Sequence, residues 1–354
     1  MPLSTTANPN SVKPDGGPLP LAVTMGEPAG IGPEIILKAW DRRQEENLAP
    51  FVVLGAKDVL HQYAPDLPLV SVTSPRDCPA IFDKALPVLD LPCPSRITPG
   101  QPDKTSAPQV IDAIDRAVEL VFAGEARAVV TAPIQKSVLY EAGFDCPGHT
   151  EYLARLCNAH TGKPHQAVMM LASTLTATDT LRVVPLTIHV PLKDVPALIT
   201  AELLSQTLEI LHMALHQDFA LSSPRIAVAG LNPHAGEDGG LGQEEQDIIL
   251  PTLNRLRRKG RILQGPLSAD TLFHANARKN YDAVLCMYHD QALIPLKTLD
   301  FEGGVNITLG LPIIRTSPDH GTALNIAGQN QANPQSFINA LKMAELMAAN
   351  RTMR

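Results

Sequence analysis

Short apolar runs alternate along the chain with segments whose apolar residues recur at helical spacing. The runs predict β-strands at 19–25, 51–55, 128–131, 168–172, 181–188, 225–230 and 283–287. The helical spacing predicts helices at 107–124, 196–217, 247–259 and 334–349. Strands that alternate with helices are typical of an α/β fold with a largely parallel sheet. With 354 residues the chain is long enough for two domains.

Three of the predicted strands lead into a histidine. His189, His234 and His289 follow the runs at 181–188, 225–230 and 283–287. We expect each of them in a loop at the carboxyl end of its strand, where ligands bind in open α/β sheets. Three imidazoles with an open position suit a catalytic metal. The alternative is three unrelated histidines among eleven, because their spacing matches no compact motif.

A second group of polar residues could bind an anion. It comprises Lys136, His149, Thr150, Lys297 and Arg315. A single lysine or arginine usually lies on a solvated face, but Lys297 and Arg315 follow the apolar runs ALIPL and LGLPII. A guanidinium holds phosphate or carboxylate with a planar fork, and an ammonium holds it as a point charge. We therefore expect an anionic group on the ligand.

The segment GEPAGIGPE at 26–34 joins the first predicted strand to a helix. Pro33 suits a first helical turn, and Glu34 suits its positive end. The glycines permit a tight turn and a close approach of backbone to a ligand. The segment is neither GxGxxG nor a P-loop, so a plain turn and a ligand loop both remain open.

Composition narrows the class of protein. The formal net charge of -7 argues against a nucleic-acid or anionic-membrane partner. Five cysteines without a CxxC pair argue against a disulfide framework and favour a reducing compartment. Residues 1–19 are polar and rich in Pro, Gly and Ser, which predicts a disordered tail. No apolar run reaches the length of a membrane span, so the expected location is cytoplasmic.

Several long motifs follow one another along the chain: GEPAGIGPEI, TAPIQK, PGHTEYLA, NPHAGE, GPLSADTLF, MYHDQ and GVNITLGLPIIRTSPDHGTA. Together they resemble the 4-hydroxythreonine-4-phosphate dehydrogenase family of pyridoxal phosphate biosynthesis. GIGPE and HGTALNIAGQNQANP are also similar to isopropylmalate and isocitrate dehydrogenases. The resemblance implies two α/β domains with a cleft between them, not a standard Rossmann fold. We expect residues 20–137 plus 290–354 on the cofactor side, and 138–289 on the metal and dimer side.

The same resemblance implies roles for individual residues. It implies a homodimer with shared active sites, in which His189 and His234 from one subunit and His289 from the other hold a divalent metal. Candidate catalytic residues are Lys297, Asp270 and Asp290. The substrate-binding positions are His149, Thr150, Lys297, Asn306 and Arg315, and the cofactor-binding positions are His320, Gly321, Thr322 and Asn325.

The chain departs from the family pattern at some positions. Ala292 stands where a glycine is usual, and Ile188 stands where threonine is common. The segment 173–180 is longer than expected. Asn325 stands where the wider group often has an acidic residue that holds the adenosine ribose. That last difference leaves the choice between NAD and NADP open.

The implied reaction is a metal-dependent, NAD(P)-linked oxidation. 4-Phosphohydroxy-L-threonine would give 2-amino-3-oxo-4-phosphobutanoate, which decarboxylates to 3-amino-2-oxopropyl phosphate in vitamin B6 biosynthesis. Zinc suits three imidazoles best, with magnesium or cobalt as alternatives. One alternative substrate is a 4-phosphorylated four-carbon sugar acid, 4-phospho-D-threonate or 4-phosphoerythronate. Rivals of other classes are a zinc hydrolase and a non-catalytic sensor of a phosphorylated ligand.

Overall fold

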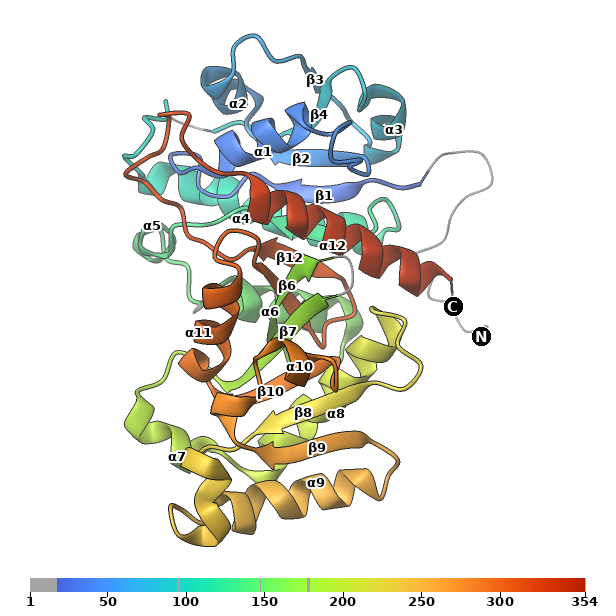
Figure 1. Ribbon diagram of the computed structural model, residues 1–354. Helices are drawn as coiled ribbons and strands as arrows, with labels where there is room; N and C mark the ends of the chain where they lie inside the picture. The colour runs from blue at the N-terminus through green and yellow to red at the C-terminus, as the bar shows by residue number, and fades with distance from the viewer. Residues whose placement is uncertain (1–17, 94–95, 147, 177–178, 354) are drawn as a thin grey trace. The chain divides into compact units, whose positions relative to one another are not determined.

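The computed structural model describes residues 18–93, 96–146, 148–176 and 179–353 (Figure 1). The chain forms two compact units, the first made of residues up to 167 and from 311 onward, and the second of residues 168–310. All but the last two residues of the predicted disordered tail lie outside the described residues. Among the described residues, no helix has the length and apolar character needed to cross a membrane.

The first unit contains a parallel sheet. Its strand order is β3-β4-β2-β1-β5-β12, and every pairing that joins these strands is parallel. The strands are β1 (Leu21–Thr24), β2 (Phe51–Gly55), β3 (Leu69–Ser71), β4 (Leu86–Asp90), β5 (Val129–Thr131) and β12 (Arg315–Pro318). The helices are α1 (Gly32–Asp41), α2 (Lys57–Tyr63), α3 (Cys78–Ile81), α4 (Ala107–Phe122), α5 (Lys136–Glu141), α6 (His149–Thr161) and α12 (Gln335–Thr352).

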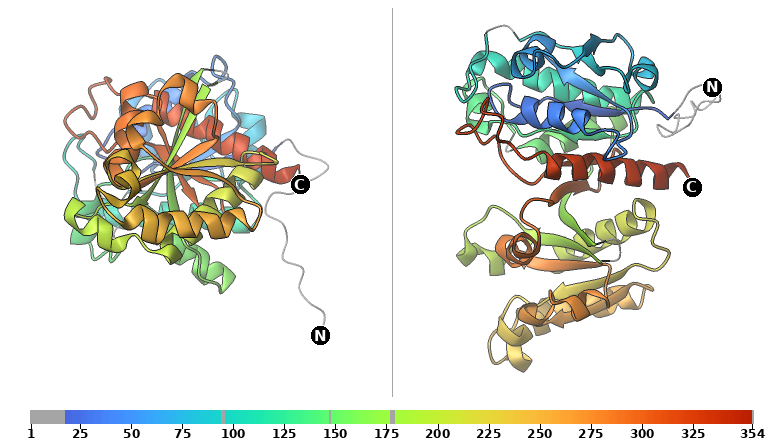
Figure 2. Two further views of the ribbon diagram at one scale, coloured as in Figure 1. Left: turned by 60° about the horizontal axis from the view of Figure 1, so that its bottom comes forward. Right: turned by 45° about the horizontal axis from the view of Figure 1, so that its top comes forward.

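Burial explains the sequence pattern of this sheet. β1 and β2 are buried at every position, which is why they appear as continuous apolar runs without alternation. On one face, Ala113 and Ala117 of α4 pack in a cluster with Ala22 of β1 and Val129 of β5. The long helix α12 packs along β12 (Figure 2). The polar residues that follow β1 and β5 are therefore held at the edge of a rigid core.

The second unit has a mixed sheet with the order β11-β6-β7-β10-β8-β9. β7, β10, β8 and β9 pair in parallel, whereas β11, β6 and β7 pair antiparallel. The strands are β6 (Val168–Thr176), β7 (Asp179–Thr187), β8 (Arg225–Ala229), β9 (Ile262–Leu267), β10 (Ala283–Tyr288) and β11 (Val305–Leu309). The helices are α7 (Val195–Leu198), α8 (Ala201–Gln217), α9 (Leu250–Arg257), α10 (Ala275–Arg278) and α11 (His289–Leu299).

The predicted helices and strands lie where the structure has them, but the pairing of some strands differs from the expected one. Every predicted strand and helix is present, with boundaries that differ by a few residues. The helix predicted at 196–217 is divided into α7 and α8, and the one predicted at 247–259 begins with a π-helical turn at Glu245–Ile249 before α9. The apolar runs do not predict strands β3, β4, β9, β11 and β12. The antiparallel ladder departs from the parallel pairing expected of alternating strands and helices, because β6 and β7 succeed one another without a helix between them.

The boundaries of the two units differ from the predicted 137 and 289. Helix α6 belongs to the first unit, because Leu153 and Cys157 are buried in the same cluster as Ala113 of α4. Helix α11 belongs to the second unit, because Leu293 and Leu296 are buried with Val183 of β7. β11 stays with the second unit because it pairs with β6. Packing, which the linear pattern does not show, determines these assignments.

The packing of α6 gives a testable prediction about stability. Leu153 is fully buried on α6, so Leu153→Ala should leave a cavity and lower the free energy of unfolding by about 2–5 kcal/mol. Glu151→Gln on the exposed side of the same helix should change it by less than about 0.5 kcal/mol. Urea unfolding followed by circular dichroism measures both. Equal effects of the two substitutions would contradict the packing described for α6.

Candidate functional site

In the first unit, polar side chains gather where β5 and α6 meet the start of β12. Arg315 begins β12, Thr131 ends β5 and His149 begins α6. The Arg315 guanidinium donates to the Thr131 hydroxyl from Nε at 3.2 Å and from Nη2 at 2.7 Å. Its Nη2 lies 3.4 Å from Nδ1 of His149. The structure therefore brings two of the predicted anion-binding residues together.

This group is buried, and burial shapes its charge. Arg315 is only 3% exposed, and burial lowers its pKa to about 10, which leaves it charged at neutral pH. Burial, followed by the charges of Arg315 and Lys136, holds the pKa of His149 well below its usual range. His149 is therefore neutral at neutral pH, and among the described residues its buried Nε2 has no hydrogen-bond partner. The result is a buried cation beside a neutral imidazole, an arrangement that suits an anion.

Lys136 and Thr150 lie beside this group. Lys136 begins α5, and a Cβ at Gly148 would lie 3.1 Å from its Nζ. The absence of a side chain at position 148 therefore lets the ammonium approach the start of α6. Thr150 is the next residue of α6 after His149, in its first turn, where backbone N–H groups also favour a negative ligand.

The two glycine-containing segments that resemble the wider dehydrogenase group touch each other. The backbone N–H of Ile31 donates to Thr322 O at 3.0 Å, and a Cβ at Gly30 would lie 3.0 Å from the same oxygen. The Thr322 hydroxyl donates to Oε1 of Gln135 at 2.7 Å. Gly26 adopts φ +73°, and a Cβ there would meet Pro133 O at 2.4 Å. Close backbone contact thus explains the glycines of this turn, in addition to any ligand.

The remaining predicted cofactor positions lie in irregular chain after β12. Nδ1 of His320 is 3.1 Å from Gly321 O, and Gly321 and Asn325 are exposed. Thr322 is the member of this set that is buried and anchored to neighbouring elements. A ligand on this loop would meet exposed backbone at one end and a fixed hydroxyl at the other.

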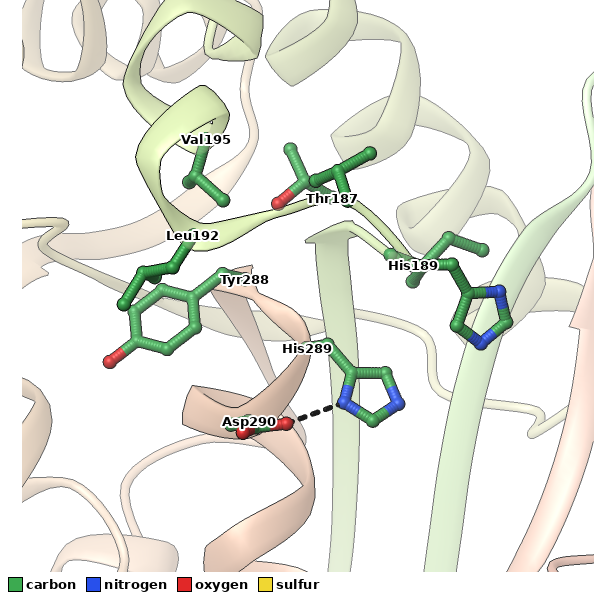
Figure 3. A pocket seen from close by; sticks show the side chains of 9 residues that line it. Thr187, His189, Leu192, Val195, Tyr288, His289 and Asp290 are labelled. Atoms are coloured by element: carbon green, nitrogen blue, oxygen red, sulfur yellow. Dashed lines mark hydrogen bonds and ion pairs between the residues drawn. The ribbon is translucent and has the colours of Figure 1, made fainter.

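In the second unit, two imidazoles meet beside a pocket of about 250 Å³ (Figure 3). β7 and β10 are parallel neighbours with Thr187 opposite Tyr288, so His189 and His289 leave the sheet side by side. Their ring centroids are 5.7 Å apart. Nδ1 of His289 lies 2.7 Å from Oδ1 of Asp290. The pocket is lined by Thr187, Ile188, His189, Val190, Leu192, Val195, Tyr288, His289 and Asp290.

The three histidines are presented in different ways. His289 is the first residue of α11, so the expectation of a loop is wrong for it. His189 follows β7 with φ +50°, and His234 lies in a left-handed turn at Pro233–Gly239 after β8. Asp270 lies near His234. The pKa of Asp270 is lowered mainly by a hydrogen bond from the Ser268 hydroxyl, and the charge of His234 lowers it further. Asp270 is therefore ionised at neutral pH.

The donors fit a borderline divalent metal in type, because imidazole is its usual ligand. Within the described residues, however, no group of three His, Cys, Asp or Glu side chains is placed to hold a metal. The chain by itself brings two imidazoles together, His189 and His289. This pair differs from the pair His189 and His234 that the resemblance implies for one subunit.

Two further predicted residues belong to the second unit. Lys297 is in the last turn of α11, with Nζ 5.5 Å from the ring centroid of Phe301. Asn306 is in β11, opposite Leu171 of β6. The sequence reasoning missed Thr131 and Gln135, which contact Arg315 and Thr322. Thr131 ends a strand and Gln135 directly precedes Lys136, and these positions could have indicated both residues.

Comparisons with known proteins place the chain in a family. The family model described as "Pyridoxal phosphate biosynthetic protein PdxA" matches residues 46–344. A 4-hydroxythreonine-4-phosphate dehydrogenase of Bradyrhizobium diazoefficiens is 52% identical over 344 residues, which cover 94% of this chain and 98% of that protein. The enzyme of the same name from Zymomonas mobilis is 48% identical over 332 residues, covering 94% and 96%.

The fold agrees with the sequence comparison. The crystal structure of 4-hydroxythreonine-4-phosphate dehydrogenase from Klebsiella pneumoniae matches with a TM-score of 0.80 and 36% identity, covering 93% of this chain and 99% of that one. This match confirms the α/β fold class that the sequence predicts, and the shared family confirms the resemblance on which the prediction rested. The chain therefore belongs to the PdxA family of pyridoxal phosphate biosynthetic proteins and is an oxidoreductase.

Proposed function

We propose that the protein oxidises 4-phosphohydroxy-L-threonine to 2-amino-3-oxo-4-phosphobutanoate, using a divalent metal and NAD or NADP. The keto acid then decarboxylates to 3-amino-2-oxopropyl phosphate on the route to pyridoxal phosphate. The names of the relatives support this substrate. The observation that carries the proposal is the buried Arg315 beside Thr131 and the neutral His149, which suits an anionic group of the substrate.

The first unit would bind the substrate phosphate. Arg315 donates to one oxygen, and His149 and Thr150 add donors at the start of α6. A neutral imidazole with a free Nε2 can take the tautomer that the ligand requires, donating when it carries hydrogen. Lys297 and Asn306 of the second unit are assigned to the same substrate on the resemblance, and Lys297 or Asp270 would accept the hydroxyl proton. Asp270 is ionised and therefore able to act as a base.

His189, His234 and His289 would hold the metal, with zinc preferred and magnesium or cobalt as alternatives. A divalent ion held by these residues would supply Lewis acidity toward the substrate hydroxyl. Asp290 lies beside Nδ1 of His289; by accepting a hydrogen bond from Nδ1–H, it would leave the lone pair of Nε2 for the metal. This is how a carboxylate next to a ligating imidazole selects its tautomer. Asp290 would therefore act on the site through His289.

The nicotinamide cofactor would lie against the loop that contains His320, Gly321, Thr322 and Asn325. Thr322 is fixed there by Gln135 and by the backbone of Ile31, which gives the loop a rigid point. Asn325 is exposed and uncharged, which leaves NAD and NADP as alternatives. We further propose a cytoplasmic homodimer with shared active sites.

A turnover screen tests the proposal against its rivals. NAD and NADP are each combined with 4-phosphohydroxy-L-threonine, 4-phospho-D-threonate and 4-phosphoerythronate, and reduced nicotinamide is followed by absorbance. The proposal expects the first substrate to be preferred. A preference for a sugar acid would show that the protein acts on the alternative class of substrate. Metal-dependent hydrolysis without nicotinamide reduction would support a hydrolase, although membership of an oxidoreductase family argues against it.

The phosphate site predicts a cost for Arg315→Lys. A point charge cannot reproduce the forked donors that reach Thr131 and the ligand, so kcat/KM should fall by about 10- to 100-fold, equivalent to roughly 1.5–3 kcal/mol. Arg116→Lys is the matched control, because Arg116 forms an exposed ion pair with Glu119 on α4. It should leave kcat/KM within about twofold. An Arg315→Lys enzyme as active as the control would exclude Arg315 from substrate binding.

The neutral state of His149 predicts a pH dependence of stability. Its pKa is lowered on folding, so below about pH 6.5 the unfolded chain takes up a proton that the folded chain does not. This contribution destabilises the fold progressively as pH falls from about 6.5 toward the depressed folded value. His149→Asn removes the titrating group, so its melting temperature should fall less than that of the wild type between pH 7 and pH 5. Parallel melting curves over this range would rule out a buried neutral His149.

Shared active sites predict complementation between two inactive variants. If His189 and His289 of one site come from different subunits, refolding His189→Ala together with His289→Ala makes about half the dimers mixed and restores about a quarter of all sites. Activity should then return in the mixture but not in either variant alone. The 5.7 Å separation of the two rings within one chain supports the rival arrangement. No recovery despite proven subunit exchange would establish that arrangement.

A further inference from the structure

The segment that carries His234 has an unusual backbone. His234, Ala235, Gly236, Glu237 and Asp238 have φ values of 51°, 52°, 82°, 44° and 54°, so they form a continuous left-handed turn. Four of the five are not glycine, and an L-residue in this region brings its Cβ close to the following carbonyl oxygen. Such a turn persists only where the surroundings hold it.

A buried carboxylate holds the turn from inside. Glu245 is 3% exposed. Its Oε1 accepts from the backbone N–H of Asn232 at 2.8 Å, and its Oε2 accepts from Nδ2 of Asn232 at 2.9 Å. The carbonyl of Asn232 then accepts from the N–H of Ala235 at 3.1 Å, inside the turn. Glu245 thus fixes the residue from which the left-handed turn begins.

The glycines around Glu245 show how closely it fits. A Cβ at Gly236 would lie 2.7 Å from Oε2, and a Cβ at Gly230 would lie 3.1 Å from Oε1. Both positions therefore need a residue without a side chain to admit the carboxylate. The carboxylate is thus in close contact with the turn at Gly236, two residues after His234.

A second side chain links this turn to the segment that carries His289. Gln291 lies two residues after His289 on α11. Its Nε2 donates to Gly230 O at 2.8 Å, and its Oε1 accepts from the N–H of Met287 at 2.7 Å. One amide therefore joins the end of β10 to the chain that leaves β8.

We propose that Glu245 is a positioning residue that holds the left-handed turn presenting His234 to the metal. Gln291 sets the end of β8, from which this turn leaves, relative to the segment of His289. The inference rests on the proposed function, in which His234 and His289 are metal ligands. Glu245 itself is buried against Asn232 and the glycines and acts through the backbone.

Cobalt binding to metal-stripped protein tests this role without relying on turnover. Glu245→Gln keeps the shape but places an NH₂ group opposite a donor of Asn232. Cobalt affinity should fall by about tenfold or more, with an altered visible spectrum, as expected when the support of a ligating histidine is changed. Glu244→Gln is the matched control, because Glu244 accepts from the same Nδ2 at 2.8 Å but is less buried. It should stay within about twofold of the wild type.

A rescue variant separates positioning from general loss of stability. Glycine adopts φ near +52° at lower cost than alanine, so Ala235→Gly should relax the turn and restore cobalt affinity and spectrum in the Glu245→Gln background. If Glu245→Gln does not fold, Gly236→Ala tests the same contact, because its Cβ meets the carboxylate while the charge is retained. Unchanged cobalt binding in whichever of the two variants folds overturns the proposal.

Hydrogen exchange keeps the inference testable even if the metal assignment fails. Peptides that cover 232–242 should exchange faster in Glu245→Gln than in Glu244→Gln, with or without metal. If the wild type binds no cobalt but this difference is present, the metal assignment fails and the positioning of the turn stands. If exchange over 232–242 is the same in both variants, Glu245 does not hold the turn and the inference is wrong.

Discussion

A buried guanidinium constrains the first unit. Moving a charge out of water is costly unless hydrogen bonds or an opposite charge compensate, and Arg315 is almost wholly enclosed. Its donors reach the hydroxyl of Thr131, and the nearest imidazole is kept neutral so that it does not repel the cation further. An anionic ligand beside Arg315 would add an opposite charge to these contacts. The first turn of α6 lies beside Arg315, because His149 begins that helix and the core packs α6 against α4.

In the second unit, the ends of the strands determine where the histidine side chains lie. β7 and β10 are parallel neighbours, so the residues that follow them lie side by side without further help. The chain after β8 must instead bend back, and it does so through a left-handed turn that Glu245 and Asn232 hold in place. The second unit thus contains one pair of imidazoles placed by sheet geometry and a third histidine placed by a left-handed backbone.

Membership of the PdxA family establishes the class of enzyme, whereas the geometry shows which side chains lie together. The relatives establish the class of enzyme and the fold, since they cover nearly the whole chain at about half identity or match its structure closely. The geometry of each unit shows which side chains can act together: Arg315 with His149, Thr322 with Gln135, and His189 with His289. The identities of the substrate, the metal and the nicotinamide cofactor depend on how the protein contacts each of them, and these identities are proposals.

The sequence by itself determined the family and most of the helices and strands. Strand 51–55 and helix α4 could be predicted because apolar periodicity is a local property, and long collinear motifs identified the dehydrogenase family. The tertiary structure decided which elements share a core and which side chains meet. Arg315 and Thr131 are 184 residues apart, and Gln291 and Gly230 are 61 apart, so no local pattern reveals either bond. The pairing of β11 with β6 arises for the same reason, because the two strands lie far apart in the chain. The left-handed turn depends on the burial of Glu245 against Asn232, which the pattern of apolar residues does not show.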